Sequence, residues 1–239
     1  MSRFKLTNRT YWILLTGILM GKAVIAALCS SDFESRLFTP FLSQALAHPG
    51  NPWEAVWVAS GPNGFPLSPF PYPPVMYALF LPVALLTKLL ANSPIAVQNF
   101  IFKLPTFAAD IGILLVLRNV FPKRRGMILF IYFASPIIIY SCYMHSQLDL
   151  IPTGILVIAI YYMTRNRLIY SAIFMALAVC AKFHVLAALP LILIFIYKNF
   201  KRIYTMYYLV IFVVICSVLL LPFAGSAGFA RYVLENEQQ

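Results

Sequence analysis

The sequence RGMILFIYFASPIIIYSCYMHSQLDLIPTGILVIAIYYMTRNR, residues 125–167, decides the fold. Two apolar runs, 127–143 and 148–164, stand on either side of a short polar turn, and arginines stand at both ends of the segment. Long apolar runs with few charges are typical of membrane spans, and Lys and Arg favour the cytoplasmic side of the membrane. The segment therefore predicts a membrane hairpin with its ends in the cytoplasm and its polar turn outside.

The composition of the whole chain agrees with this hairpin. Of 239 residues, 62% are hydrophobic and 10% are charged, whereas about a quarter of the residues in a soluble domain are charged. We therefore expect an integral, multi-pass membrane protein. The net charge of +11 comes from basic clusters at the ends of apolar runs, where membrane topology requires them, so nucleic acid is not an expected partner. The four cysteines lie within or at the ends of apolar runs without metal-ligand spacing, and we expect them to be packing residues.

Basic clusters predict how many runs cross the membrane. The first run is longer than the core of a secretory signal, so we expect an uncleaved span. If all the clusters face the cytoplasm, the number of crossings between successive clusters must be even. Besides the two runs of the hairpin, the apolar runs are 11–29, 74–92, 98–117, 168–181, 185–198 and 203–222. The clusters are Arg3/Lys5/Arg9, Arg118/Lys123/Arg124/Arg125, Arg165/Arg167 and Lys198/Lys201/Arg202.

Three runs stand between the first two clusters, so one of them should not cross. We choose 74–92, PVMYALFLPVALLTKLLAN, because prolines precede it, Pro82 interrupts it and Lys88 lies near its end. It is expected to be an external re-entrant or interfacial segment. The prediction is an all-α polytopic membrane protein with about seven transmembrane helices in a single domain, 1–239. Its N-terminus is cytoplasmic, and a long first external loop, 30–97, holds this segment and an interfacial helix that starts near Asp32. All seven acids then lie outside or in the outer part of a span.

Polar and ionisable residues converge on the external face in this topology. Because polar groups in or beside membrane spans are costly, each is a candidate site residue. The candidates are Asp32, Glu34 and Arg36 after the first span, Lys103 and Asp110 in 98–117, His145, Gln147 and Asp149 in the quoted turn, and Lys182 and His184 in the next external turn. Structural alternatives are that Asp110 pairs with Lys103, that Asp149 caps the helix starting at Leu150, that His184 is an interfacial histidine, and that Lys22 either extends its amine toward the membrane surface or pairs with an acid. These alternatives do not explain why acids, lysines and histidines gather on one side.

The order of these segments resembles a known family. An acid just after the first span, a loop ending in YPP, then KLPTFAAD, SPIIIYSCYMHSQLD and AKFHVLAALP are similar to polytopic glycosyltransferases of the GT-C fold. The nearest in pattern are bacterial polyprenyl-phosphate-mannose-type enzymes and the dolichyl-phosphate-glucose-dependent glucosyltransferases. The resemblance covers residues 10–225 approximately, and its specificity comes from the order and spacing of motifs that are each weak alone.

The resemblance implies a module of seven spanning helices and an inverting transfer of a sugar from a polyprenyl-phosphate carrier. The acceptor would be a lipid, glycan or protein on the external or luminal face, which in a bacterium is the periplasmic face of the inner membrane. Asp32 would be the general base. Lys103, Lys182, Arg36 and His184 would bind the donor phosphate. The residues expected to support substrate binding are Glu34, Tyr72, Asp110, His145, Gln147 and Asp149, with Ser146 and Gln147 matching the family pattern before the aspartate.

The chain departs from the family pattern at Ser135, His145 and Ser146, and family members continue for further helices after the point where this sequence stops. A fragment of a longer protein, a split subunit that needs a second membrane chain, and a minimal enzyme are therefore all open. A non-catalytic subunit of a glycosyltransferase complex and a lipid-linked sugar transporter are the rival functions. No cofactor and no metal is required by this mechanism, with the alternative that Asp32 together with Asp149 or His145 holds a divalent cation.

Overall fold

The computed structural model describes residues 6–47, 50–60 and 70–235, and all regular secondary structure in these ranges is helical. The prediction of an all-α chain is confirmed. Arg3, Lys5, Glu237 and parts of the predicted external loop (48–49 and 61–69) lie outside the described residues. The α-helices are α1 (Asn8–Leu28), α2 (Thr39–Ala47), α3 (Pro52–Ser60), α4 (Pro74–Leu89), α5 (Ile95–Phe102), α6 (Leu104–Val120), α7 (Arg125–Ile128), α8 (Pro136–Ile138), α9 (Leu150–Thr164), α10 (Leu168–Val179), α11 (Leu189–Asn199), α12 (Arg202–Leu220) and α13 (Ala227–Phe229).

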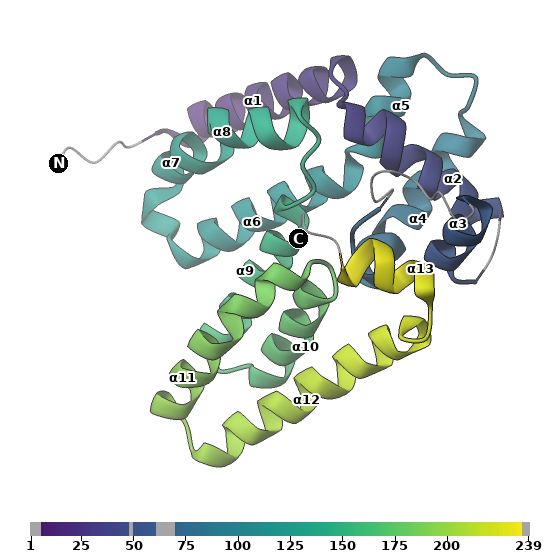
Figure 1. Cartoon of the computed structure of the whole chain (residues 1–239). Helices are drawn as coiled ribbons and strands as arrows, with labels where there is room; N and C mark the ends of the chain where they lie inside the picture. Colours follow the sequence, from purple (N-terminus) through teal and green to yellow (C-terminus); the bar gives the residue numbers. More distant parts are fainter. Residues whose placement is uncertain (1–5, 48–49, 61–69, 236–239) are drawn as a thin grey trace.

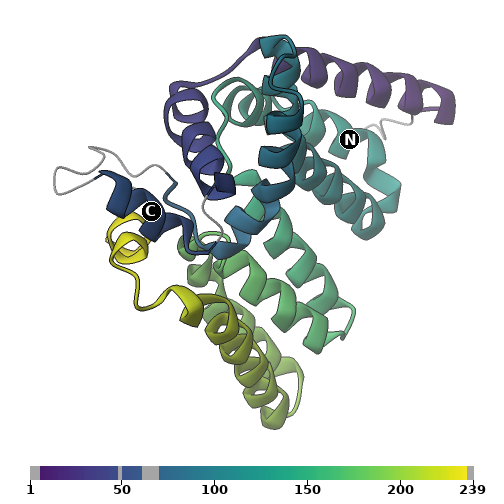
Figure 2. The same cartoon turned by 90° about the vertical axis from the view of Figure 1, so that its right-hand side faces the viewer.

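The helices form two arms that meet at one end and diverge at the other (Figure 1). The first arm holds α1, α6 and the α7–α8 segment, and the second holds α9 to α12. Helices α2 to α5 and α13 gather where the arms meet, and the view turned by 90° shows the same arrangement (Figure 2). The turns predicted to be external therefore lie together, while the basic clusters of the described residues lie at the far ends of the arms.

In the first arm, α1 and α6 run antiparallel and are joined by two polar side-chain contacts. Lys103, just before α6, hydrogen-bonds to the carbonyl of Cys29 at the end of α1, and Asp110 pairs with Lys22 seven residues earlier in α1. Thr7 is the N-cap of α1, and its side-chain oxygen accepts a hydrogen bond from the backbone N–H of Thr10. The Lys103–Cys29 and Asp110–Lys22 contacts are seven residues apart in both segments, so together they fix the register between α1 and α6.

The second arm packs through small residues. Ala159 of α9 and Ala172, Ala176 and Ala178 of α10 are fully buried in one cluster with residues of α12. Small side chains let helix backbones approach closely, which is the usual basis of helix association in membranes. The two arms approach each other closely at Gly154 of α9. A side-chain carbon at this position would lie 3.3 Å from the Cβ of Ala109 in α6.

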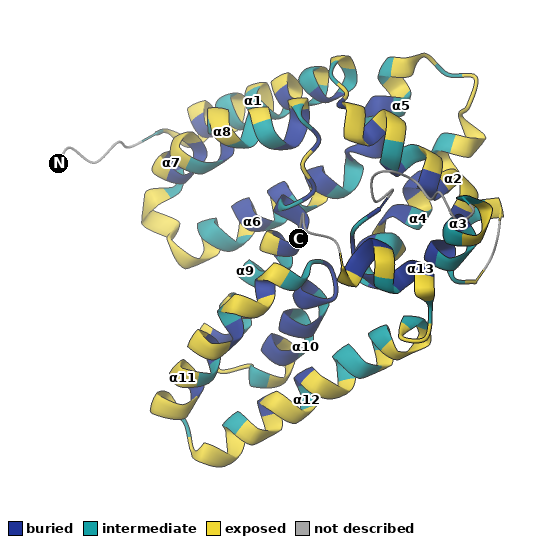
Figure 3. Ribbon diagram, in the orientation of Figure 1, coloured by how far each residue is buried: buried dark blue, intermediate teal, exposed yellow. Residues whose placement is uncertain are grey.

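The outer faces of the arms are apolar and exposed (Figure 3). By length and composition, two helices of the described chain, Asn8–Leu28 and Arg202–Phe223, could each cross a membrane. Two bent pairs, Ile95–Phe102 with Leu104–Val120 and Pro122–Phe133 with Pro136–Met144, raise this number to four if each is one span. This pattern is consistent with a polytopic membrane protein. The number of seven crossings and the orientation stay predictions.

The structure of helix α4 differs from the prediction that Pro82 interrupts this segment. Pro82 lies inside a continuous helix, Pro74–Leu89, and does not break it. A membrane-buried helix tolerates a proline when neighbouring packing compensates for the lost backbone hydrogen bond, and Met76, Phe80 and Val83 of α4 are buried in the largest core cluster. The interruption by proline was therefore the wrong reason to exclude a crossing, and the placement of 74–92 outside the membrane stays a prediction.

The predicted interfacial helix begins where expected. A π-helical turn, Phe33–Phe38, continues directly into α2. Phe41, Leu42 and Ala45 of this segment are buried, whereas Phe33 is exposed. Phe38 is also buried and stacks on Phe102, so this helix packs against α5 where the two arms meet.

Candidate functional site

The turn after α1 sends two carboxylates in different directions. Asp32 precedes the π-helical turn, and its carboxylate is 80% exposed, 3.5 Å from Nε of Arg36. Glu34, two residues on, is buried, and its backbone N–H donates to the hydroxyl oxygen of Ser31. Because successive helical residues are about 100° apart, side chains two positions apart face nearly opposite sides. The local helix thus exposes one acid and buries the other.

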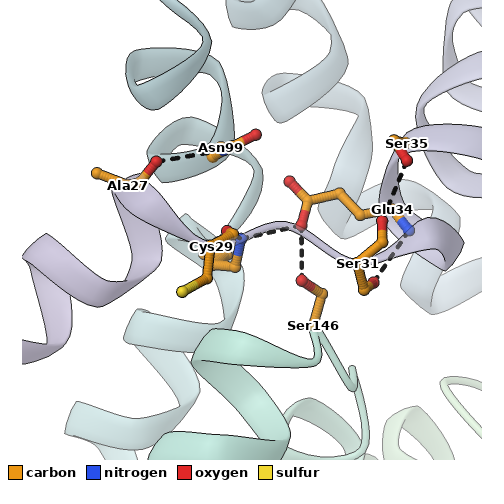
Figure 4. Close-up of polar contacts among 8 residues, drawn as sticks. Ala27, Cys29, Ser31, Glu34, Ser35, Asn99 and Ser146 are labelled. Atoms are coloured by element: carbon orange, nitrogen blue, oxygen red, sulfur yellow. Dashed lines mark hydrogen bonds and ion pairs between the residues drawn. The ribbon is translucent and has the colours of Figure 1, made fainter.

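Glu34 is the centre of a buried polar cluster (Figure 4). Nζ of Lys103 donates to Oε2 of Glu34 at 2.9 Å and to the carbonyl of Cys29 at 2.7 Å, and the hydroxyl of Ser146 donates to the same Oε2 at 2.6 Å. Asn99 donates to the carbonyl of Ala27 at 3.2 Å beside this cluster. A buried ion pair is stable when further hydrogen bonds satisfy it. The cluster therefore ties together the end of α1, the start of α6 and the 145–149 turn.

Ser146 adopts an unusual backbone conformation to reach Glu34. Its φ is +56°, in the left-handed region that few residues other than glycine adopt. The residue is buried, and the hydrogen bond to Glu34 helps to hold this conformation. The neighbouring side chains His145 and Gln147 are left partly or fully exposed.

Asp32, Arg36 and His145 line one hollow of about 490 Å³. Phe33, Leu37 and Met144 form part of its apolar wall. The imidazole of His145 meets the ring of Phe33 edge-on, with 5.8 Å between the ring centroids. The volume lies within the range of small-molecule sites, and a few polar groups on an apolar wall are typical of them.

A second group of candidates surrounds Lys182. Lys182 forms an ion pair with Asp149, and its Nζ lies 5.7 Å from the ring centroid of Tyr72. Burial, followed by the charge of Asp149, raises the pKa of the Tyr72 phenol, so this group stays protonated. Partial burial, followed by the charge of Lys182, lowers the pKa of His184 from its usual 6.5. His184 is therefore neutral at pH 7 and could donate a hydrogen bond to a phosphate without adding a positive charge.

Asp149 precedes α9 but does not cap it through its side chain. No hydrogen bond joins its carboxylate to the first N–H groups of α9, and the carboxylate pairs with Lys182. The capping alternative is wrong for this side chain because the lysine is the stronger partner. Ser146 and Asp149 are three residues apart, so the Glu34 cluster and the Lys182 group are linked by about 11 Å of chain at most.

Asp110 lies away from the hollow, inside the first arm. It pairs with Lys22 at 2.5 Å and accepts hydrogen bonds from the hydroxyls of Tyr143 at 2.6 Å and Tyr132 at 2.9 Å. Both charged side chains are fully buried. The alternative that Asp110 pairs with Lys103 is wrong, because the antiparallel register places Lys22 opposite Asp110 and leaves Lys103 for Glu34. The expectation that Lys22 pairs with an acid is confirmed.

The structure also identifies a polar contact that the sequence did not suggest. Glu54 of α3 accepts hydrogen bonds from the hydroxyl of Ser226 at 2.6 Å and from the N–H of Gly228 at 3.0 Å. These bonds, first Ser226 and then Gly228, lower the pKa of the Glu54 carboxyl. Gly228 is required here, because a side-chain carbon would lie 2.3 Å from the carbonyl oxygen of Trp53. In the sequence, this contact is indicated only by a serine and a glycine two residues apart, Ser226 and Gly228, after the last apolar run. That pattern is too short to predict that the segment packs against α3.

The described residues do not bring together a metal-binding cluster of three or more His, Cys, Asp or Glu side chains. Asp32 and His145 share the hollow, but Asp149 is neutralised by Lys182. Arg36 beside Asp32 would also repel a cation. The donor set therefore fits a divalent ion poorly.

The described chain is all-helical, and its charged turns collect at one end, which is consistent with the resemblance to GT-C glycosyltransferases stated from the sequence motifs. The profile of glycosyltransferase family 87, a GT-C type family, matches residues 70–239. The chain belongs to glycosyltransferase family 87 and is a GT-C type glycosyltransferase. No protein of curated function and no solved structure matches it. The matched range includes Tyr72, Lys103, the 145–149 turn and Lys182, while Asp32, Glu34 and Arg36 precede it.

Proposed function

We propose that the protein transfers a sugar, with inversion, from a polyprenyl-phosphate carrier to an acceptor hydroxyl on the external face of the membrane, which in a bacterium is the periplasmic face of the inner membrane. The observation that supports this most is the exposed carboxylate of Asp32 in a hollow shared with Arg36 and His145. Glu34 and Asp149, in the same group of turns, are each paired with a lysine.

In the proposed step, Asp32 accepts the proton of the acceptor hydroxyl as its oxygen bonds to the anomeric carbon. The bond from that carbon to the phosphate oxygen breaks, and its electron pair leaves with the polyprenyl phosphate. General bases contribute about 10²–10⁴-fold to such rates. Inversion follows because the acceptor attacks from the face opposite to the leaving phosphate.

Negative charge develops on the leaving phosphate, so cations near the hollow would stabilise the transition state. Arg36 is exposed beside Asp32, and Lys182 is partly exposed beside Asp149, so these two side chains are the proposed phosphate contacts. Lys103 is 1% exposed and already bonded to Glu34 and Cys29. We propose that it holds the turn in place in this conformation and reaches a phosphate only if the Glu34 pair opens.

The test is to incubate the purified protein with radiolabelled polyprenyl-phosphate sugars and a membrane-lipid extract. We expect labelled product with the inverted anomeric configuration, retained in the presence of EDTA. Label transferred only from a nucleotide sugar would reject the carrier, and product with the retained configuration would reject the single displacement. Absence of transfer unless a second membrane chain is supplied would favour the split-subunit alternative.

A further inference from the structure

A second hollow lies at the far end of the second arm. It has a volume of about 590 Å³ and is lined by the α9–α10 loop, the first turn of α10, Phe200 and the first half of α12. Helix α10 has 12 residues and separates this hollow from Lys182 by about 18 Å. It is therefore distinct from the site around Asp32.

Four of the ten residues that line this hollow are tyrosines. Tyr170, Tyr204 and Tyr207 line it and are exposed, and Tyr208 forms a buried part of the wall with its hydroxyl near Ser171. Tyrosine combines an apolar ring with a polar tip and is enriched where a membrane meets water. The hollow thus has the chemistry of the headgroup region of a bilayer.

Arg167 is the basic residue that lines this hollow. Its guanidinium has no hydrogen-bond or ion-pair partner in residues 6–47, 50–60 and 70–235. The sequence from Leu150 to Leu234 contains no Asp or Glu, so its own arm offers no acid to this guanidinium. Other arginines at this end are engaged, since Arg165 stacks on Tyr161 and Arg202 on Tyr197.

We propose that this hollow binds one anionic phospholipid from the leaflet that meets the basic ends of the helices. Its phosphate would pair with Arg167, and an acyl chain would follow the apolar wall toward Ile211. Arginine matches phosphate oxygens with two parallel hydrogen bonds. Basic pockets between membrane helices bind anionic headgroups, and the volume suits a headgroup with the start of its chains. The tyrosine walls and the exposed apolar helices favour a lipid over a soluble anion.

The experiment is native mass spectrometry of the full chain in detergent, with added phosphatidylglycerol, phosphatidylcholine or inorganic phosphate. We expect one phosphatidylglycerol to be retained in preference to phosphatidylcholine. Arg167→Gln should lower this retention about fivefold, the effect of one basic residue near an anionic membrane surface. Ile211→Trp should also lower it by filling the apolar end without changing the charge. Arg165→Gln is the matched control, because it removes a charge from the same loop but outside the hollow.

Size-exclusion profiles verify that each variant is folded, and Arg167 is exposed and unpartnered, so its substitution should not disturb folding. Equal losses in Arg165→Gln and Arg167→Gln with no effect of Ile211→Trp would overturn the proposal in favour of diffuse surface attraction. Equal retention of phosphatidylcholine would reject the anionic headgroup. Complete displacement of the lipid by millimolar inorganic phosphate would reject the contribution of the acyl chain.

Discussion

Asp110 and Asp32 are two aspartates near α1 with opposite surroundings. Asp110 is fully buried and bound by Lys22 and the hydroxyls of Tyr132 and Tyr143. Asp32 is mostly exposed, in a hollow, with one arginine at 3.5 Å. A carboxylate with three donors has little capacity left for a substrate, whereas an exposed one can still accept a proton. The number of hydrogen-bond and ion-pair partners therefore distinguishes Asp110, which stabilises the first arm, from Asp32, which is proposed to react.

The largest expected effect is on catalysis. Asp32→Asn removes the proposed base and should lower the transfer rate about 10²–10⁴-fold without changing thermal stability. The measurement is transfer of labelled sugar per folded molecule. Glu235→Gln is a matched control, because Glu235 is also an exposed acid that pairs with an arginine four residues away in sequence. A rate in Asp32→Asn equal to that of the control would remove Asp32 as the base.

The next effect is on stability. Asp110→Ala leaves Lys22 buried without its partner, and such a loss costs about 3–5 kcal/mol. We expect a lower unfolding temperature, followed by fluorescence-detected size-exclusion chromatography after heating. The double variant Lys22→Met with Asp110→Leu should recover much of the stability, because it removes both buried charges. An unchanged unfolding temperature in Asp110→Ala would show that the pair does not stabilise the arm.

A smaller loss of thermal stability is expected from substitutions of Ser146 in the 145–149 turn. Ser146→Ala removes a hydrogen bond to the Glu34 carboxylate and should cost about 1.5–3 kcal/mol. Ser146→Gly loses the same bond but adopts positive φ more easily, so its loss of stability should be smaller by about 1 kcal/mol or more. The comparison is made by thermal unfolding. Wild-type stability in Ser146→Ala would show that Glu34 does not hold the turn.

The smallest expected effect is a pH dependence of hydrogen exchange in residues 226–234, the segment that packs against α3. Hydrogen bonds lower the pKa of Glu54 in the folded state, so its contribution to stability is present above the unfolded value of about 4.5 and is lost as pH falls through the lower folded value. Hydrogen exchange of residues 226–234 should therefore quicken as the pH falls below 4.5, after correction for the intrinsic exchange rate. Glu54→Gln should exchange faster already at pH 7 and lose this pH response. The same response in Glu54→Gln would assign it to another group.

The sequence predicted the class of fold and the grouping of charged turns, because apolar runs and basic clusters act over long stretches and do not depend on side-chain detail. Of the candidate site residues, Asp32, Arg36 and His145 share a hollow and Asp149 pairs with Lys182, whereas Asp110 lies inside the first arm. The sequence did not predict that Lys22, rather than Lys103, is the partner of Asp110, because that depends on the register between α1 and α6. Pro82 misled the prediction since packing around α4, which a sequence does not show, keeps the helix continuous. Tyr132 and Tyr143 were missed because they come from either side of the bend at Pro136.

The most direct test of the central claim sets Asp32→Asn beside Asp110→Asn in one transfer assay, with the rate expressed per folded molecule. The account predicts that Asp32→Asn is fully folded and transfers almost no sugar, while the folded fraction of Asp110→Asn transfers sugar at close to the wild-type rate. Near-wild-type transfer by Asp32→Asn together with an inactive folded Asp110→Asn would contradict it.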